Sequence, residues 1–178
     1  MTKERMLGKE RRKYIVTKLQ ASTEPVTGKT LAEETGVSRQ VIVTDMALLK
    51  TSNEPIIATN RGYIYMDKKE NEYTHQKVII CQHTPEQARK ELEIIVDYGV
   101  TVVDVIVEHP FYGELTGSLM IRSRFDVEQF LTAISTEEAS LLSELTDGIH
   151  LHTIEADSEE KLQQACEQLQ EAGILYTE

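Results

Sequence analysis

The chain has 178 residues, with 30 acidic against 19 basic side chains and a formal net charge of −11. Two cysteines make no disulfide framework, and there is neither a signal peptide nor a membrane-spanning apolar run, so we expect a cytoplasmic protein. The charge is uneven: residues 1–69 carry 13 Lys+Arg against 8 Asp+Glu, and residues 70–178 carry 6 against 22. This asymmetry predicts two domains, of which the first can approach DNA phosphates and the second is repelled by them.

The first 50 residues predict three helices. Residues 8–22 carry apolar side chains at helical spacing. Their basic residues form either a solvated face or a set of phosphate contacts: Arg11, Arg12 and Lys13. Residues 27–50, TGKTLAEETGVSRQVIVTDMALLK, predict two short helices joined by a tight turn at Gly36. This pattern is typical of a helix-turn-helix.

The second helix of that pair is built to expose side chains. Ser38 can cap it, and a buried stripe recurs at positions i, i+4 and i+7: Ile42, Met46 and Leu49. The opposite face holds side chains that can bond base edges or touch thymine methyl groups: Arg39, Gln40, Val43, Thr44 and Ala47. This face predicts major-groove contacts with double-stranded operator DNA. The alternative is an ordinary helical hairpin with a solvated polar face.

Residues 56–66 alternate around the turn Asn60-Arg61-Gly62 and predict a β-hairpin. A hairpin directly after a helix-turn-helix predicts a winged helix, with Arg61 at the wing tip, where it could enter a minor groove. We therefore predict a winged-helix DNA-binding domain at 1–67, followed by a charged linker at 68–75.

Residues 76–178 predict the second domain, an α+β sandwich with the element order β-α-β-β-α-β. The predicted strands lie at 77–82, 101–108, 113–121 and 149–154, and the predicted helices at 84–98, 126–134, 136–145 and 158–172. The predicted caps are Thr84 with Pro85 and Gln87 for the first helix, and Asp126 for the second. This order predicts a ferredoxin-like sheet with its helices on one face.

Three histidines and a carboxylate are the strongest candidates for a metal site. His150 and His152 are two residues apart on a predicted strand, so both imidazoles emerge on one face, where they can share a metal or remain solvated. His83 lies between a strand end and a helix cap, and Glu91 falls beside the buried stripe of that helix, where a carboxylate needs a partner. The set suits a transition ion with positions left for an outside ligand.

Other polar residues leave alternatives open. Glu91 could instead be a rim carboxylate paired with Arg89 or Lys90. Cys81 alternates with His83 and could add a sulfur ligand, although a lone cysteine in a strand is more often a small buried hydrophobe.

Two further groups could bind a small carboxylate or serve the fold. Arg122 and Arg124 form a pair whose guanidinium groups can take a carboxylate or pair with the acids of this domain. His109 opens the run HPFYG and either lines the metal site or bonds a turn.

Five stretches carry a resemblance to a known family. They are VSRQVIVTDMALL, His83 with Glu91 eight residues on, HPFYG from His109, SRFDVEQF from Ser123 and LTDGIHLHTI from Leu145. With these stretches the whole chain resembles the nicotinate-responsive transcription repressors of NAD biosynthesis, which join a winged helix to a 3H domain. Phe111 departs from the smaller aliphatic residue expected there.

The resemblance implies a dimeric bacterial repressor that regulates NAD biosynthesis or niacin uptake genes. Its 3H domain is expected to hold one divalent transition metal per subunit, nickel, zinc or iron, on residues matching His83, Glu91, His150 and His152. Nicotinic acid is the implied effector, and its candidate contacts are Arg124, His109, Arg122 and Tyr112. A metal sensor, in which the ion itself is the signal, is the alternative. An enzyme is not expected, because no second free carboxylate is available as a base.

Overall fold

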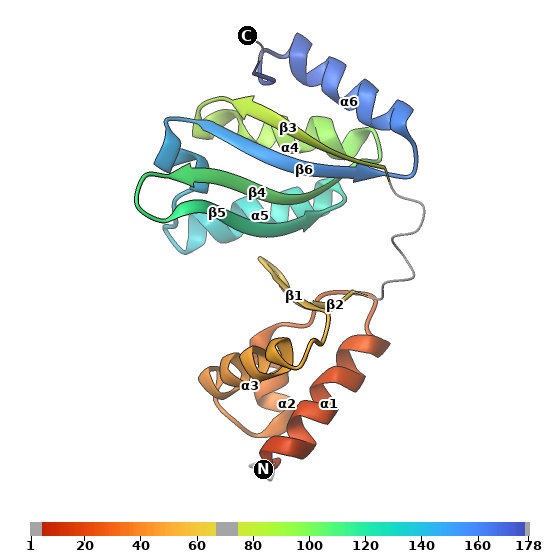
Figure 1. Cartoon of the computed structure of the whole chain (residues 1–178), viewed down its shortest axis with the longest axis vertical. Helices are drawn as coiled ribbons and strands as arrows, with labels where there is room; N and C mark the ends of the chain where they lie inside the picture. Colours follow the sequence, from red (N-terminus) through yellow and green to blue (C-terminus); the bar gives the residue numbers. More distant parts are fainter. Residues whose placement is uncertain (1–4, 67–74, 177–178) are drawn as a thin grey trace. The chain divides into compact units, whose positions relative to one another are not determined.

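The computed structural model describes residues 5–66 and 75–176 (Figure 1). The chain divides into two compact units, Met1–Glu70 and Asn71–Glu178. Most of the predicted linker at 68–75 lies outside the described residues, but His75 begins strand β3 (His75–Gln82). No helix in the described ranges is both long and apolar enough to cross a bilayer.

The first unit contains the three predicted helices and the predicted hairpin. They are α1 (Gly8–Ala21), α2 (Gly28–Thr35), α3 (Arg39–Thr51), β1 (Ile56–Thr59) and β2 (Gly62–Tyr65). Ser38 caps α3 as predicted, because its side chain accepts the N–H of Val41 at 3.4 Å. Gly36 ends α2 in a left-handed conformation, with φ of 66°. A core of buried aliphatic residues, including Ile15, Leu31 and Ile42, joins the three helices.

The wing has one feature that the sequence did not reveal. Val26 forms a two-way bridge with Tyr63, in which each N–H donates to the other's carbonyl oxygen at 2.9 Å. Gly62 is required for this contact, because its φ is 136° and a Cβ there would stand 2.6 Å from the oxygen of Val26. The segment before α2 is thereby fixed to the wing.

A buried ion pair joins α1 to α3 and corrects the expectation for the basic residues of α1. Arg11 is only 6% exposed, and its Nε donates to Oδ2 of Asp45 at 2.5 Å. Nη1 of the half-buried Arg12 reaches the other oxygen of Asp45 at 3.2 Å. Arg11 is therefore neither on a solvated face nor available to a phosphate, whereas Lys13 is exposed.

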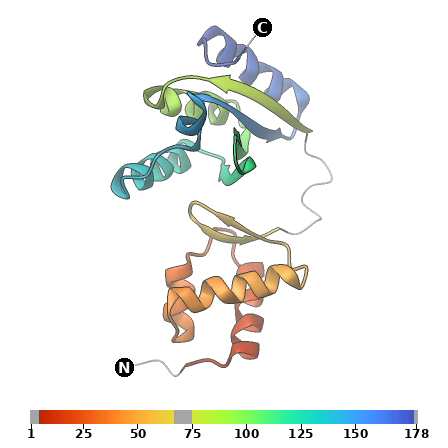
Figure 2. The ribbon, with the colours of Figure 1, turned by 60° about the vertical axis from the view of Figure 1, so that its left-hand side comes forward.

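The second unit has the predicted order of strands and helices, and a four-stranded antiparallel sheet in the order β3-β6-β4-β5. After β3 come η1 (Pro85–Gln87), α4 (Ala88–Asp97), β4 (Thr101–His109), β5 (Gly113–Ile121), α5 (Arg124–Thr136), η2 (Leu142–Thr146), β6 (Ile149–Ala156) and α6 (Glu159–Glu171). Figures 1 and 2 trace the strands and helices of this unit. Residues of α4, α5 and α6 share one core with the inward side chains of the strands. The last strand, β6, lies between β3 and β4 and not at an edge, so the strand order differs from that of the predicted ferredoxin-like sheet, in which the last strand lies at an edge beside the first.

The helix after β5 differs from the prediction. Ser123, and not Asp126, is the N-cap of α5, because its side chain accepts the N–H of Asp126 at 3.2 Å. The separate helix predicted at 136–145 is wrong. α5 runs to Thr136, and Glu138 then adopts a left-handed conformation with φ of 49°, which prevents the helix from continuing. The short 3₁₀ helix η2 follows.

Candidate metal centre and recognition face

Four buried side chains from three parts of the second unit converge on its helix-covered side. They are His83 after β3, Glu91 in the first turn of α4, and His150 and His152 on β6, with exposures of 7%, 2%, 2% and 3%. The register of β6 places both of its histidines on one face, as the spacing predicted, opposite Cys81 and Ile79 of β3. The structure thus brings together all four residues predicted as metal ligands.

The turn before β6 explains how His150 comes to lie beside His83. Gly148 adopts φ of 87°, and a Cβ at this position would stand 2.3 Å from the carbonyl oxygen of His83. Only glycine permits so close an approach in this conformation. The two imidazole rings then meet edge to face, with centroids 4.9 Å apart.

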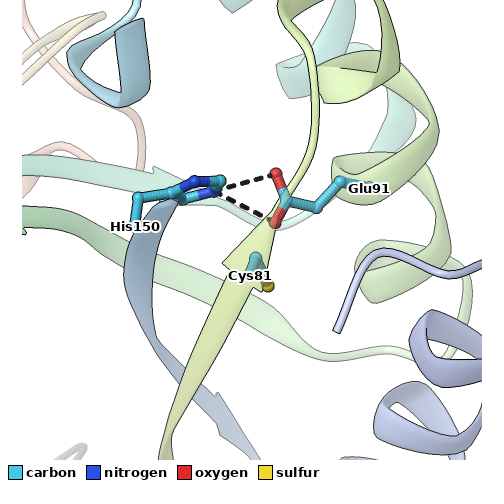
Figure 3. Close-up of side chains that lie close together, drawn as sticks. All are labelled: Cys81, Glu91 and His150. Atoms are coloured by element: carbon cyan, nitrogen blue, oxygen red, sulfur yellow. Dashed lines mark hydrogen bonds and ion pairs between the residues drawn. The ribbon is translucent and has the colours of Figure 1, made fainter. Parts of the chain in front are cut away.

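Glu91 is the centre of the cluster. Its carboxylate oxygens lie 2.7 Å from Nε2 of His83, 3.2 Å from Nε2 of His150 and 3.5 Å from Nε2 of His152 (Figure 3 shows the His150 contacts). The alternative of a rim carboxylate paired with Arg89 is excluded, because Arg89 contacts Glu128 at 2.6 Å and Glu91 is buried.

In each histidine ring, the nitrogen that points away from Glu91, Nδ1, identifies the tautomer. Nδ1 of every one of the three histidines contacts a backbone carbonyl oxygen, at 2.8 Å for His83 with Thr84, 2.9 Å for His150 with Gly148 and 2.6 Å for His152 with Asp104. A carbonyl oxygen only accepts, so each Nδ1 carries a hydrogen, and in the neutral ring the lone pair is on Nε2. Metal-binding histidines are oriented in this way, with one nitrogen held by the protein and the other directed at the ion.

The charges of the cluster are strongly coupled. Burial alone would raise the pKa of Glu91, but the neighbouring His152 and the contacts with His150 and His83 hold this pKa well below its usual range. Burial lowers the pKa of His83 and of His152, and Glu91 outweighs this effect, so both pKa values are raised. Burial and the Glu91 carboxylate also raise the pKa of the Cys81 thiol. Each group is therefore sensitive to any cation placed among them.

One atom of the cluster tests whether a metal fits. Nε2 of His152 is buried and has no hydrogen-bond partner among the described residues, although Glu91 lies 3.5 Å away. An unsatisfied buried lone pair is costly, and a cation would satisfy it. Three imidazole nitrogens and a carboxylate form a donor set that suits divalent zinc, nickel or iron. The four residues therefore fit a transition metal.

The candidate effector contacts fall at two ends of the sheet. Arg124 pairs with Asp97 at 2.6 Å and with Glu93 at 3.5 Å, and the side chain of Arg122 is exposed. Both follow the end of β5, where Ile121 pairs with Val102 of β4. Val102 pairs on its other side with Ile154, which lies four residues, or roughly 13 Å, along β6 from His150. The strand that carries the two histidines, β6, is an inner strand of the sheet.

His109 and Tyr112 lie at the other end, toward the start of β6, because Ile106 of β4 faces Leu151. Nδ1 of His109 accepts the N–H groups of Phe111 and Tyr112 at 3.2 and 3.3 Å. His109 therefore both bonds a turn and keeps Nε2 as a donor. Phe111 and Tyr112 are 90% and 77% exposed, so this turn is on the surface.

The first unit presents the predicted recognition face on α3. The side chains predicted for this face are all exposed: Arg39, Gln40, Val43, Thr44 and Ala47. The N-cap residue Ser38, at the start of the face, is exposed as well and is a further candidate DNA contact. The side chain of Arg61 lies in the hairpin turn and pairs with Glu24 at 3.2 Å. Asp45, on the opposite side of α3, is the structural residue that the helical pattern missed, because a buried carboxylate breaks an otherwise apolar stripe.

Comparison with known proteins agrees with both units. An HTH domain matches residues 11–64, and the 3H domain matches residues 76–178. The chain is 48% identical over 177 residues to the transcription repressor NadR of Bacillus subtilis, covering 98% of each protein. It is 41% identical over 169 residues to the probable transcription repressor NiaR of Thermotoga maritima, covering 95% of each. The resemblance found in the sequence is confirmed, and the chain belongs to the family of transcription repressors that join an HTH domain to a 3H domain.

Proposed function

We propose that this repressor binds operator DNA through α3 and the wing, and that its 3H domain holds one divalent transition ion per subunit and senses nicotinic acid. The regulated genes are those of NAD biosynthesis or niacin uptake. The active species is a homodimer, because helix-turn-helix repressors bind paired half-sites with two copies. His83, Glu91, His150 and His152 are the proposed ligands.

The observation that carries this proposal is the geometry of the three histidines. Their Nε2 atoms surround one buried carboxylate, and their Nδ1 atoms are all fixed by backbone carbonyls. A cluster kept only for stability has no need of three imidazoles with the same orientation, and the unsatisfied Nε2 of His152 costs stability unless a cation is bound. The bound ion would supply a Lewis-acidic position for the pyridine nitrogen or a carboxylate oxygen of nicotinic acid.

Calorimetric titration tests the effector. Metal-loaded protein is expected to bind nicotinic acid, to bind nicotinamide much more weakly, and to lose nicotinic acid binding after the metal is removed. The neutral amide forfeits the charge-assisted hydrogen bonds of the carboxylate, at a cost of about 1.5–3 kcal/mol for each. Equal affinity for the two compounds, or unchanged binding by stripped protein, contradicts the proposal.

A matched pair of variants locates the carboxylate contact. His109→Ala is expected to weaken nicotinic acid binding, because His109 lies toward the metal end of the sheet with Nε2 as a donor. Arg124→Ala is expected to leave the affinity unchanged, because Asp97 and Glu93 already engage Arg124. The opposite pattern would identify Arg124, and not His109, as the contact of the carboxylate.

The runner-up is a repressor for which the ion itself is the signal. This alternative is favoured if protein atoms occupy every coordination position of the ion. Cys81 lies close enough to Glu91 and His150 to supply one more protein ligand. In that case metal-loaded protein binds operator equally with and without nicotinic acid. Under our proposal, operator affinity changes on addition of nicotinic acid, and the family leads us to expect an increase.

The role of Arg39 in base recognition is testable by substitution. Arg39 is exposed at the start of α3, where recognition helices contact base edges. Arg39→Ala is expected to lose about 1–3 kcal/mol of binding free energy for operator and little for random DNA. Lys13→Ala, which removes an exposed lysine of α1, serves as the control for simple loss of charge. Fluorescence anisotropy measures both affinities. If Arg39→Ala lost the same binding free energy for operator and for random DNA, Arg39 would contact phosphate and not bases.

A further inference from the structure

Cys81 belongs to the same buried cluster as the proposed metal ligands. It lies opposite His150 across the β3–β6 pair and is 0% exposed. One ligand atom from each of Cys81, Glu91 and His150 lies within 4.8 Å of the other two (Figure 3). In a tetrahedral zinc site a sulfur and a nitrogen ligand stand about 3.5 Å apart, so atoms separated by 4.8 Å must close by about 1.3 Å to share one ion.

We propose that the thiolate of Cys81 is a further protein ligand of the ion, so that the centre has mixed sulfur, nitrogen and oxygen coordination. This inference rests on the metal centre proposed above and specifies its chemistry. On coordination the S–H bond is replaced by a bond between sulfur and the metal, and the proton passes to solvent.

Two observations separate this role from that of a small buried hydrophobe. First, the cluster already contains a buried donor atom without a hydrogen-bond partner among the described residues, Nε2 of His152, on the β6 face that Cys81 adjoins. Second, the other cysteine provides a comparison within the same core. Cys166 of α6 is also buried, yet within the described ranges it joins no group of carboxylate and imidazole atoms of this kind. The position of Cys81, and not burial alone, therefore distinguishes it.

A thiolate ligand changes which ions the site prefers. Soft sulfur favours zinc and other thiophilic ions over manganese or magnesium, which prefer oxygen ligands. With Cys81 the protein supplies five ligands, so a six-coordinate ion keeps one position for an outside ligand such as nicotinic acid.

X-ray absorption spectroscopy of the zinc-loaded full chain tests the proposal without any substitution. We expect one sulfur neighbour at about 2.3 Å from zinc in addition to nitrogen and oxygen neighbours at about 2.0–2.2 Å. A shell of nitrogen and oxygen alone would overturn the assignment of Cys81 while leaving the proposed metal centre intact. Failure of the protein to take up zinc at all would instead contradict the metal centre itself.

Cobalt-loaded protein then identifies the sulfur. A sulfur-to-cobalt charge-transfer band is expected in the near ultraviolet for the unaltered chain and for Cys166→Ser, and its loss is expected in Cys81→Ser. Because both variants exchange a buried thiol for a hydroxyl in the same core, they are matched for the cost of substitution. A band that persists in Cys81→Ser and disappears in Cys166→Ser would overturn the proposal.

Discussion

Replacing His150 and His152 together with alanine is expected to abolish stoichiometric metal binding. The pair supplies two of the three imidazoles around Glu91, and its removal leaves His83 as the only histidine among the proposed ligands. Elemental analysis of freshly purified protein measures the result. His75→Ala, an exposed histidine at the start of β3, is the control and should retain one ion per subunit. A full equivalent of metal in the double variant would show that the ion is bound elsewhere.

The double variant also leaves the buried carboxylate with fewer partners, so its fold must be checked by circular dichroism. Glu91→Gln provides a second variant of nearly the same shape, in which the amide cannot supply the anionic ligand. Metal content should fall in this variant too, although the three imidazoles remain. A stable, well-folded Glu91→Gln protein that retains a full ion would remove Glu91 from the ligand set.

The pH dependence of the same centre has opposite signs with and without metal. In the metal-free protein, the raised pKa values of His83 and His152 mean that bound protons stabilise the fold below about pH 6.5, and this contribution is lost as the pH rises through the raised values. Metal binds only neutral imidazoles, so its contribution grows as the pH rises. The difference in Tm between loaded and stripped protein should therefore increase from pH 6 to 8, and metal should leave below roughly pH 6.

Local patterns in the sequence predicted most of the elements that build the two proposed sites. The caps of Ser38 and Thr84, the hairpin at Gly62 and the two-residue spacing of His150 and His152 depend on neighbours within a few residues, and the structure has each of them. Such features follow from backbone geometry that one segment determines by itself.

Features that depend on distant partners were not predictable in the same way. The order of elements predicted a ferredoxin-like sheet, with the last strand at an edge. In the structure β6 pairs with both β3 and β4, and its histidines therefore lie in the middle of the sheet. The role of Arg124 likewise depends on Asp97, 27 residues away, whose carboxylate accepts both of its hydrogen bonds. The charge of Arg124 identified it as a possible contact for a bound anion. It did not show that the Asp97 carboxylate of the protein itself already pairs with Arg124.

Asp45 shows the same dependence in the DNA-binding unit, and it leads to the largest expected effect on stability. This carboxylate is 2% exposed on α3 and holds Arg11 and Arg12 of α1. Asp45→Ala leaves the buried guanidinium of Arg11 without its counter-ion, and the loss of one partner from a buried pair costs about 3–5 kcal/mol. Because the pair connects the recognition helix to α1, the variant should also lose operator affinity through loss of structure.

Hydrogen exchange of the α3 amides in the full chain measures this stability without interference from the second unit. Glu33→Ala is the matched control, since the Glu33 side chain is 67% exposed on α2 and its only described ion pair spans 4.0 Å to Lys29. This variant should change the free energy of opening by less than about 0.5 kcal/mol. The double variant Arg11→Met with Asp45→Leu removes both charges and should recover most of the lost stability, because apolar side chains of similar volume can replace a buried pair. The α3 amides of the Asp45→Ala variant could instead be as well protected from exchange as those of the unaltered chain. That result would show that Arg11 can reach solvent without Asp45, and that the buried pair does not hold α3 in place.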